Sequence, residues 1–164
     1  MGNKQTQANE YLFYAQKLLR IETKCQAELD AQDLKAIHAS VGLCLQRSWE
    51  AWLNELADYL NLDRLDFNDL QQSPLRDLPE SQCLLTFTLD ADSWLSRLLE
   101  RSNMTKERQP HMSSSNNMTL LNVVQIDENG LGSSVSQSEQ DILSEIVDGF
   151  KQYMQSVRSR QAEW

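Results

Sequence analysis

The residues best suited to catalysis in this chain are its two histidines, His38 and His111. Nucleophilic catalysis needs a base within hydrogen-bonding distance of the nucleophile, and histidine is the most frequent base. His111 falls in a polar stretch where no apolar pattern would fix its position. His38 follows Ile37 at the side of an apolar stripe, which is typical of a hydrogen-bonded residue at the edge of a core. The histidines therefore indicate no catalytic site.

Metal and phosphate binding also lack their usual motifs. Helical bundles bind metals through Glu-x-x-His pairs, but the residue three positions before His38 is Lys35. Glu107 and His111 are four residues apart, again in the polar stretch. The chain has neither of the glycine-rich motifs that bind nucleotide phosphates. We therefore expect no metal, no cofactor and no enzymatic activity.

Cysteine use and charge predict a compartment and exclude some partners. Cys25, Cys44 and Cys83 are far apart within apolar patterns, and their odd number without a signal peptide predicts a reducing cytoplasm. The net charge of -9 repels nucleic-acid phosphates and anionic membrane surfaces. No apolar run approaches the length of about 18 residues that a membrane span needs. We expect an acidic cytoplasmic protein that binds neither nucleic acid nor membrane.

One long helix is expected to organise the chain. Its 164 residues suit a single domain, and its 5 glycines and 3 prolines favour long helices. Apolar residues at steps of three and four predict a helix from Asp33 to Leu62, about 45 Å long. The stripe consists of Leu34, Ile37, Val41, Leu45, Ser48, Trp52, Leu56 and Tyr59.

A first helix is predicted from Asn9 to Asp30, after a flexible N-terminus over residues 1–8. Since only Ala31 and Gln32 separate it from the long helix, the two form either a tight hairpin or one kinked helix. We favour the hairpin, because two broad apolar faces need each other. The predicted buried stripe is Tyr11, Tyr14, Leu18, Ile21 and Cys25, widened by Leu12, Ala15 and Leu19.

Two short helices are expected over 80–88 and 91–102, with Pro79 at the first position of one and Asp90 as the N-cap of the other. They follow an irregular segment over residues 63–79. Its apolar anchors are Leu65, Phe67, Leu70, Leu75 and Leu78.

A long irregular segment precedes the last helix. It comprises a flexible loop over 103–117, an extended stretch from Leu120 to Ile126 and a linker over 128–135. The last helix begins with a capping box formed by Ser136 and Glu139 or, alternatively, by Ser138 and Asp141. Its predicted buried stripe is Ile142, Ile146, Phe150, Tyr153 and Val157, and its basic residues Arg158 and Arg160 suit the negative end of the helix.

The fold prediction is therefore an all-α domain over residues 9–164. We expect an up-and-down bundle of three long helices completed by the two short ones.

Two features are candidates for binding a partner. Trp49 and Trp52 lie on one helix but cannot face the same neighbour; Trp49 is either a second core residue, which we favour, or an exposed anchor. Leu120, Val124 and Ile126 lie in a lone extended stretch without a strand to pair with. That stretch would lie over the bundle or pair across a homodimer or with another protein's strand.

Three segments of the sequence also resemble, in the same order, an uncharacterised family of small gammaproteobacterial proteins, a domain of unknown function. The resemblance covers about residues 9–160, with a poor match over 103–135. It implies a bacterial cytosolic protein and carries over no activity and no functional residues. The segments are Asn9–Ala15, the second helix through Leu43–Cys44 to Leu56–Tyr59, and Ser93–Leu99.

Two hypotheses about function follow, with an enzyme of unfamiliar site ranked behind both. The first is a non-enzymatic interaction, adaptor or regulatory protein, which requires an exposed apolar patch or groove. The second is a small-molecule or lipid-binding bundle with a pocket between its helices. The residues expected to line that pocket are Tyr14, Trp52, Phe87 and Trp94.

Overall fold

The protein is built from α-helices in a computed structural model that describes residues 3–107 and 138–162. Within these residues there is no β-strand, and the predicted all-α class is confirmed. The helices are α1 (Asn3–Cys25), α2 (Ala31–Tyr59), α3 (Pro79–Thr88), α4 (Trp94–Glu107) and α5 (Glu139–Ala162), with short 3-10 turns at Asp69–Gln71 and Leu75–Asp77.

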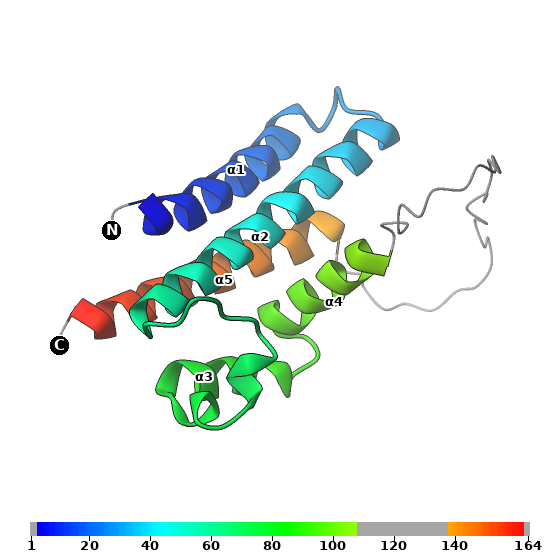
Figure 1. The fold of residues 1–164 in the computed structure, drawn as a ribbon. Helices are drawn as coiled ribbons and strands as arrows, with labels where there is room; N and C mark the ends of the chain where they lie inside the picture. The colour runs from blue at the N-terminus through cyan, green and yellow to red at the C-terminus, as the bar shows by residue number, and fades with distance from the viewer. Residues whose placement is uncertain (1–2, 108–137, 163–164) are drawn as a thin grey trace, which may run out of the picture.

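The three long helices lie side by side, with α1 at one edge and α4 beyond α2 and α5 (Figure 1). Helix α1 packs against α2 and α5, and α4 packs against α2, α3 and α5. This arrangement agrees with the predicted bundle of three long helices and two short ones. None of the helices in the described ranges is long and apolar enough to cross a membrane.

The α1–α2 connection is a hairpin, as predicted, and a capping box begins its second helix. The Asp30 carboxylate accepts hydrogen bonds from the backbone N–H groups of Gln32 and Asp33, both at 2.8 Å. The Asp33 carboxylate accepts one from the N–H of Asp30 at 3.2 Å. This reciprocal pair satisfies N–H groups that the first helical turn leaves unbonded, so α2 begins at Ala31 without a glycine or proline.

Helix α1 differs from its prediction in extent and in the face that it buries. It begins at Asn3, not Asn9, so the helix includes residues 3–8 of the predicted flexible N-terminus. Tyr14 and Ile21, placed in the core by the predicted stripe, are 44% and 47% exposed. Small residues allow α1 to lie close to α2. The hydroxyl of Ser48 on α2 donates to the backbone oxygen of Ala8 on α1 at 2.7 Å, which shows how near the two helices are. The buried residues of α1 are Ala8, Leu12, Ala15, Leu19 and Glu22.

A cluster of aromatic rings forms the core where α2, α3, α4 and α5 meet. Trp94 stacks on Phe150 with ring centroids 5.4 Å apart, and Trp49 meets both rings edge-on. Tyr153 packs against Trp52 at 5.9 Å, and burial raises the pKa of its phenol. The rings lie in the offset and edge-to-face arrangements that aromatic pairs prefer. The aromatic cluster therefore fixes α4 on α5 and both on α2.

In the segment from α2 to α4, the predicted apolar anchors agree with the structure better than the predicted helix caps do. Leu65 and Leu70 are buried, and Pro79 begins α3 as expected. Helix α4 starts at Trp94, three residues later than predicted. Its cap is the hydroxyl of Ser93, which accepts a hydrogen bond from the N–H of Ser96 at 3.1 Å. The predicted cap Asp90 instead accepts one from the N–H of Asp92.

The last two helices revise the boundaries of the predicted loop. Helix α4 runs to Glu107, so the first residues of the predicted loop over 103–117 are helical. Helix α5 begins with the Ser138–Asp141 pair, one of the two predicted alternatives: the Ser138 hydroxyl accepts from the N–H of Asp141 at 3.1 Å. The linker predicted over 128–135 lies outside the described residues.

Gly149 is where α5 leaves room for Trp94. A Cβ atom at Gly149 would lie 2.6 Å from both Cγ and Cδ1 of Trp94, closer than carbon atoms pack. Trp94 cannot retreat easily, because it stacks on Phe150. We expect Gly149→Ala to lower the free energy of unfolding by about 1–3 kcal/mol, measured by urea denaturation.

Gly42→Ala is the matched control for this prediction. Gly42 is also helical, but a Cβ atom there meets nothing within 4 Å. Since alanine has the higher helix propensity, the control should keep or raise stability, by up to about 1 kcal/mol. Equal effects of the two substitutions would show that Trp94 does not restrict Gly149.

Candidate functional site

An open groove between the first half of α2 and the facing parts of α4 and α5 is the candidate site. Its volume is about 710 Å³ and its exposed lining is mainly apolar. Leu45 and Leu98 are buried along it, and Leu43 is 55% exposed. We call it the α2–α4 groove. It is lined by Ala31, Leu34, Lys35, His38, Ala39, Gly42, Leu43, Leu45, Gln46, Leu98, Arg101, Ser102 and Glu139.

An ion pair joins α4 and α5 at the groove. Arg101 donates two hydrogen bonds to the Glu139 carboxylate, one from Nη2 to Oε2 at 3.0 Å and one from Nη1 to Oε1. These bonds hold the pKa of Glu139 below its usual value, against the opposing effect of partial burial. His38 lowers the same pKa through its charge when protonated, which places it near Glu139. The groove thus combines an apolar lining with a cluster of ionisable groups.

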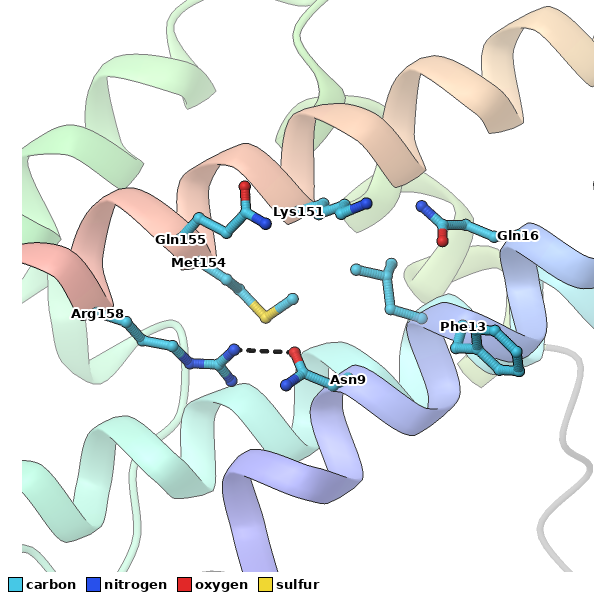
Figure 2. A pocket seen from close by; sticks show the side chains of 8 residues that line it. Asn9, Phe13, Gln16, Lys151, Met154, Gln155 and Arg158 are labelled. Carbon is cyan, nitrogen blue, oxygen red and sulfur yellow. Dashed lines mark hydrogen bonds between the residues drawn. The ribbon is translucent and has the colours of Figure 1, made fainter.

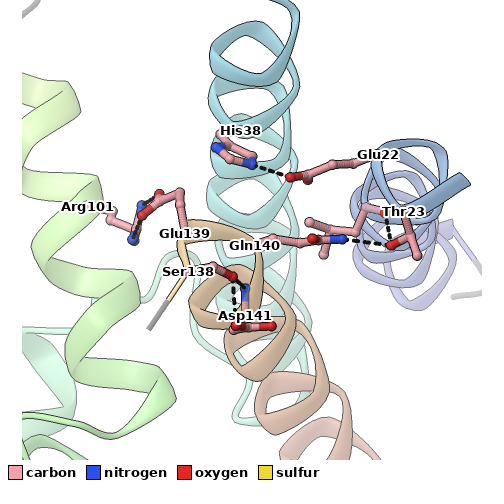
Figure 3. Close-up of polar contacts among 9 residues, drawn as sticks. Glu22, Thr23, His38, Arg101, Ser138, Glu139, Gln140 and Asp141 are labelled. Atoms are coloured by element: carbon pink, nitrogen blue, oxygen red, sulfur yellow. Dashed lines mark hydrogen bonds and ion pairs between the residues drawn. The ribbon is translucent and has the colours of Figure 1, made fainter. Parts of the chain in front are cut away.

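His38 joins the groove to a buried carboxylate on α1. Its Nε2 lies 2.9 Å from Oε1 of Glu22, whose side chain is 6% exposed (Figure 3). The predicted role of His38 as a hydrogen-bonded boundary residue is confirmed by this contact. Among the described residues, the other oxygen of Glu22 has no hydrogen-bond partner. A buried carboxylate with a single partner makes the His38 contact its main stabilising interaction.

The first turn of α5 is tied to both neighbouring helices at this end. Gln140 donates to the Thr23 hydroxyl of α1 at 2.7 Å, while Glu139 accepts from Arg101 of α4 (Figure 3). The Ser138 hydroxyl also donates to the Asp141 carboxylate at 2.7 Å. These contacts fix one wall of the groove before any ligand binds, and a preformed site loses less entropy on binding.

A second hollow, of about 280 Å³, lies between α1 and α5 (Figure 2). Lys151 and Arg158 from α5 and Asn9 and Gln16 from α1 give it a polar rim. Arg158 donates to the Asn9 side chain at 2.8 Å and to Glu55. Because this arginine is held by the protein's own groups, the hollow is a weaker candidate than the larger, more apolar α2–α4 groove.

Trp49, one of the predicted candidates for binding a partner, lies in the core. Trp49 is 5% exposed and contacts the rings of Phe67, Trp94 and Phe150. It cannot act as an exposed anchor in this fold, and the favoured core alternative is the one observed. The other three predicted partner-binding residues, Leu120, Val124 and Ile126, lie outside the described residues.

The pocket predicted around four aromatic residues does not form as expected. Phe87 and Trp94 are in ring contact at 5.5 Å, and Trp52 is fully buried against Tyr153. Tyr14 lies exposed on α1 and donates to Glu10 at 2.5 Å. The rings of α2, α3 and α4 fill the space where that pocket was predicted. The α2–α4 groove is therefore the place where a small ligand would bind.

The groove residues of α2 share a spacing in the sequence that differs from that of the main stripe. Ala39, Gly42, Leu43 and Gln46 lie three, one and three residues apart, so they share one side of the helix away from the main stripe. The other residues of the groove share no such spacing, because Arg101 and Glu139 are 38 positions apart in the chain. Within the described ranges, no group of three or more His, Cys, Asp or Glu side chains is placed to hold a metal ion.

Fold and groove together define a small all-α protein with an open apolar groove on one side of its longest helix. The chain belongs to a family of unknown function, DUF6586, which it matches over residues 1–164. This confirms the resemblance to an uncharacterised family and extends it to the whole chain; the gammaproteobacterial origin stays a prediction. Neither a curated protein nor a solved structure matches the chain.

Proposed function

We propose that this protein is a non-enzymatic interaction module of the cytoplasm that binds an apolar helix of a partner protein in the α2–α4 groove. The observation that carries the proposal is the groove itself, an apolar surface hollow of about 710 Å³ beside the half-exposed Leu43. Apolar surface of this kind is stabilised when a partner removes it from water. Adaptor and regulatory roles both depend on such a surface.

The length of the groove favours a helix as the ligand. Its α2 wall extends from Ala31 to Gln46, which corresponds to about 22 Å of helix. An amphipathic helix of about four turns has this length and presents apolar side chains every three or four residues. Ala39 and Gly42 have no bulky side chain, so a partner's backbone can approach α2 closely there.

The charges of the groove specify the partner further. Lys35 and Arg101 line it together with a single carboxylate, Glu139, in a chain whose net charge is -9. Arg101 already forms two hydrogen bonds with Glu139, which leaves Lys35 as the exposed cation of the rim. We expect the partner helix to carry an acidic residue that faces Lys35, which would select its orientation more than its affinity.

A small amphipathic anion is the second candidate for the same groove. The volume of about 710 Å³ lies within the range of roughly 300–1,000 Å³ that is usual for ligand pockets. An acyl chain along Leu34 and Leu43 would place its acidic head near Lys35. Mass spectrometry of the captured protein distinguishes this ligand from a protein helix.

The test introduces a charge into the groove. The protein is tagged at its chromosomal locus and captured from the native cell as wild type, Leu43→Glu and Leu89→Glu. Leu89 is the matched control, because it is 87% exposed and lies outside the groove. We expect one near-stoichiometric protein with wild type and control, and at least a tenfold lower yield with Leu43→Glu.

Two outcomes would contradict the proposal. A partner that Leu43→Glu retains in full does not use the groove. Recovery of the bait alone removes the interaction role. Native mass spectrometry of the same preparations then decides the second candidate: a bound acidic amphiphile present in the Leu89→Glu protein and absent from the Leu43→Glu protein would assign the groove to a small ligand.

A further inference from the structure

Five apolar or aromatic residues of α1 form a line beside its buried row, and of these only Leu18 packs against the core among the side chains that the structure describes. Tyr14 and Ile21 are about half exposed, and the other three are partly buried. Ile37 and Cys44 of α2 are likewise partly buried against the core. We call it the α1 stripe; it consists of Tyr11, Tyr14, Leu18, Ile21 and Cys25.

The spacing of the α1 stripe is that of a two-stranded coiled coil. Its steps are three, four, three and four residues, which repeat every seven and average 3.5. The buried row of α1 from Ala8 to Glu22 has the same spacing, with steps of four, three, four and three residues, and it packs against α2. The α1 stripe is therefore a second narrow apolar seam, which lies beside the row that packs against α2 and is half exposed at Tyr14 and Ile21.

We propose that the α1 stripe is covered by the same stripe of a second copy of this chain, with the two α1 helices antiparallel about a two-fold axis. Each copy then presents one surface to its equal, which is the commonest form of homodimer. In this register Leu18 faces Tyr14 of the second copy, and Tyr11 faces its Ile21. By symmetry these contacts occur twice and give four apolar layers.

Charged residues beside the stripe support this register. Glu10, Lys17 and Lys24 each precede a stripe residue by one position, and all three are exposed. In an antiparallel coiled coil, residues at this position face one another across the seam. The proposed register places Glu10 opposite Lys24 of the second copy twice, and Lys17 opposite itself at the axis.

Other pairings of the two stripes are disfavoured by the same residues. Moving the antiparallel register one step toward the C-terminus of α1 would place Lys17 opposite Lys24 twice, and like charges repel. Moving it one step toward the N-terminus would pair Glu10 with Lys17, but only the two layers between Tyr11 and Tyr14 would then join stripe residues, in place of four.

A parallel pair would place Glu10 and Lys17 opposite Ala15 and Glu22 of the second copy, which are buried within that copy's own fold and offer no exposed partner charge. Charge and burial therefore favour a second copy in one orientation.

The proposed dimer leaves the α2–α4 groove open. Helix α1 lies at one edge of the bundle, and α4 lies on the other side of α2 (Figure 1). A second copy on α1 would therefore extend the assembly away from the groove. The dimer is independent of the proposed function and would present two grooves, one from each copy.

The first test measures association of the full chain by sedimentation velocity over a range of concentrations. We expect a reversible dimer, with Ile21→Lys raising its dissociation constant at least tenfold. Leu89→Lys is the control: Leu89 is 87% exposed and lies outside α1, so dimerisation should be unchanged. A wild type that stays monomeric at about 100 μM, weaker than specific dimers usually are, would overturn the proposal.

The second test identifies the register through exposed residues, so it does not depend on a core substitution. Glu10→Lys and Lys24→Glu should each weaken the dimer about tenfold, since each converts two attractive pairs into repulsive ones. The double variant should regain the affinity of the wild type. Lys17→Gln should tighten the dimer by removing the repulsion at the axis. A double variant as weak as the two singles would rule out this arrangement, as would a dimer that Ile21→Lys leaves intact.

Discussion

Trp49→Ala is expected to lower the free energy of unfolding by about 3–5 kcal/mol, a large part of what holds a domain of this size together. Trp49 is buried, and its ring meets those of Phe67, Trp94 and Phe150 at centroid distances between 5.7 and 6.3 Å. Truncation would leave a cavity where the irregular segment after α2 meets α4 and α5. Urea denaturation followed by circular dichroism measures the loss.

Tyr59→Ala is the control for this prediction. Tyr59 also lies on α2, but it is 50% exposed at the helix end, so its truncation should cost less than about 1 kcal/mol. If Trp49→Ala were as stable as the control and still lost a partner, Trp49 would be an interface residue after all. If Trp49→Ala lost both the partner and stability, the result would show only that binding requires the folded protein.

The sequence was most informative for helices whose buried stripe is single and made of large residues. In α5, Ile146, Phe150, Tyr153 and Val157 follow the prediction and are buried. Helix α1 has two neighbouring apolar rows. The prediction placed the row with the larger residues, including Tyr14 and Ile21, in the core, whereas the row from Ala8 to Glu22 is the buried one. The distance between α1 and α2 determines which row is buried. Ala8 and Ala15 allow α1 to approach α2 closely, which bulky Tyr14 and Ile21 would prevent. A hydrophobicity pattern contains no such distance.

The candidate site could be predicted only in part, since three helices build it. The Ala39–Gln46 side of α2 can be identified from spacing, but its opposite wall cannot. Arg101 and Glu139 come together because α4 and α5 pack on the aromatic cluster, and no local pattern relates residues so far apart. His38 similarly finds Glu22 across the hairpin, where a carboxylate at a core-facing position of α1 has no hydrophobic signal.

Arg158→Ala is expected to cost about 3 kcal/mol, although the sequence suggests a smaller role for this residue. An arginine near a helix end would contribute about 0.3–1 kcal/mol through the helix dipole. In the structure Arg158 donates to both oxygens of Glu55, at 2.8 and 2.7 Å, and its guanidinium lies 5.5 Å from the centre of the Trp52 ring. Its removal would leave the Glu55 carboxylate buried without its cation, which costs far more than a lost surface contact.

Arg160→Ala is the control that separates an ion pair with buried Glu55 from a simple charge at the helix end. Arg160 is exposed near the same end of α5. Urea denaturation should give about 3 kcal/mol for Arg158→Ala and less than about 1 kcal/mol for the control. If both variants lost the same free energy of unfolding, Arg158 would contribute only through the helix dipole. The double variant Glu55→Leu with Arg158→Met should recover most of the stability. With both charges replaced by apolar side chains, α2 and α5 stay in contact and no carboxylate is left unpaired in the interior.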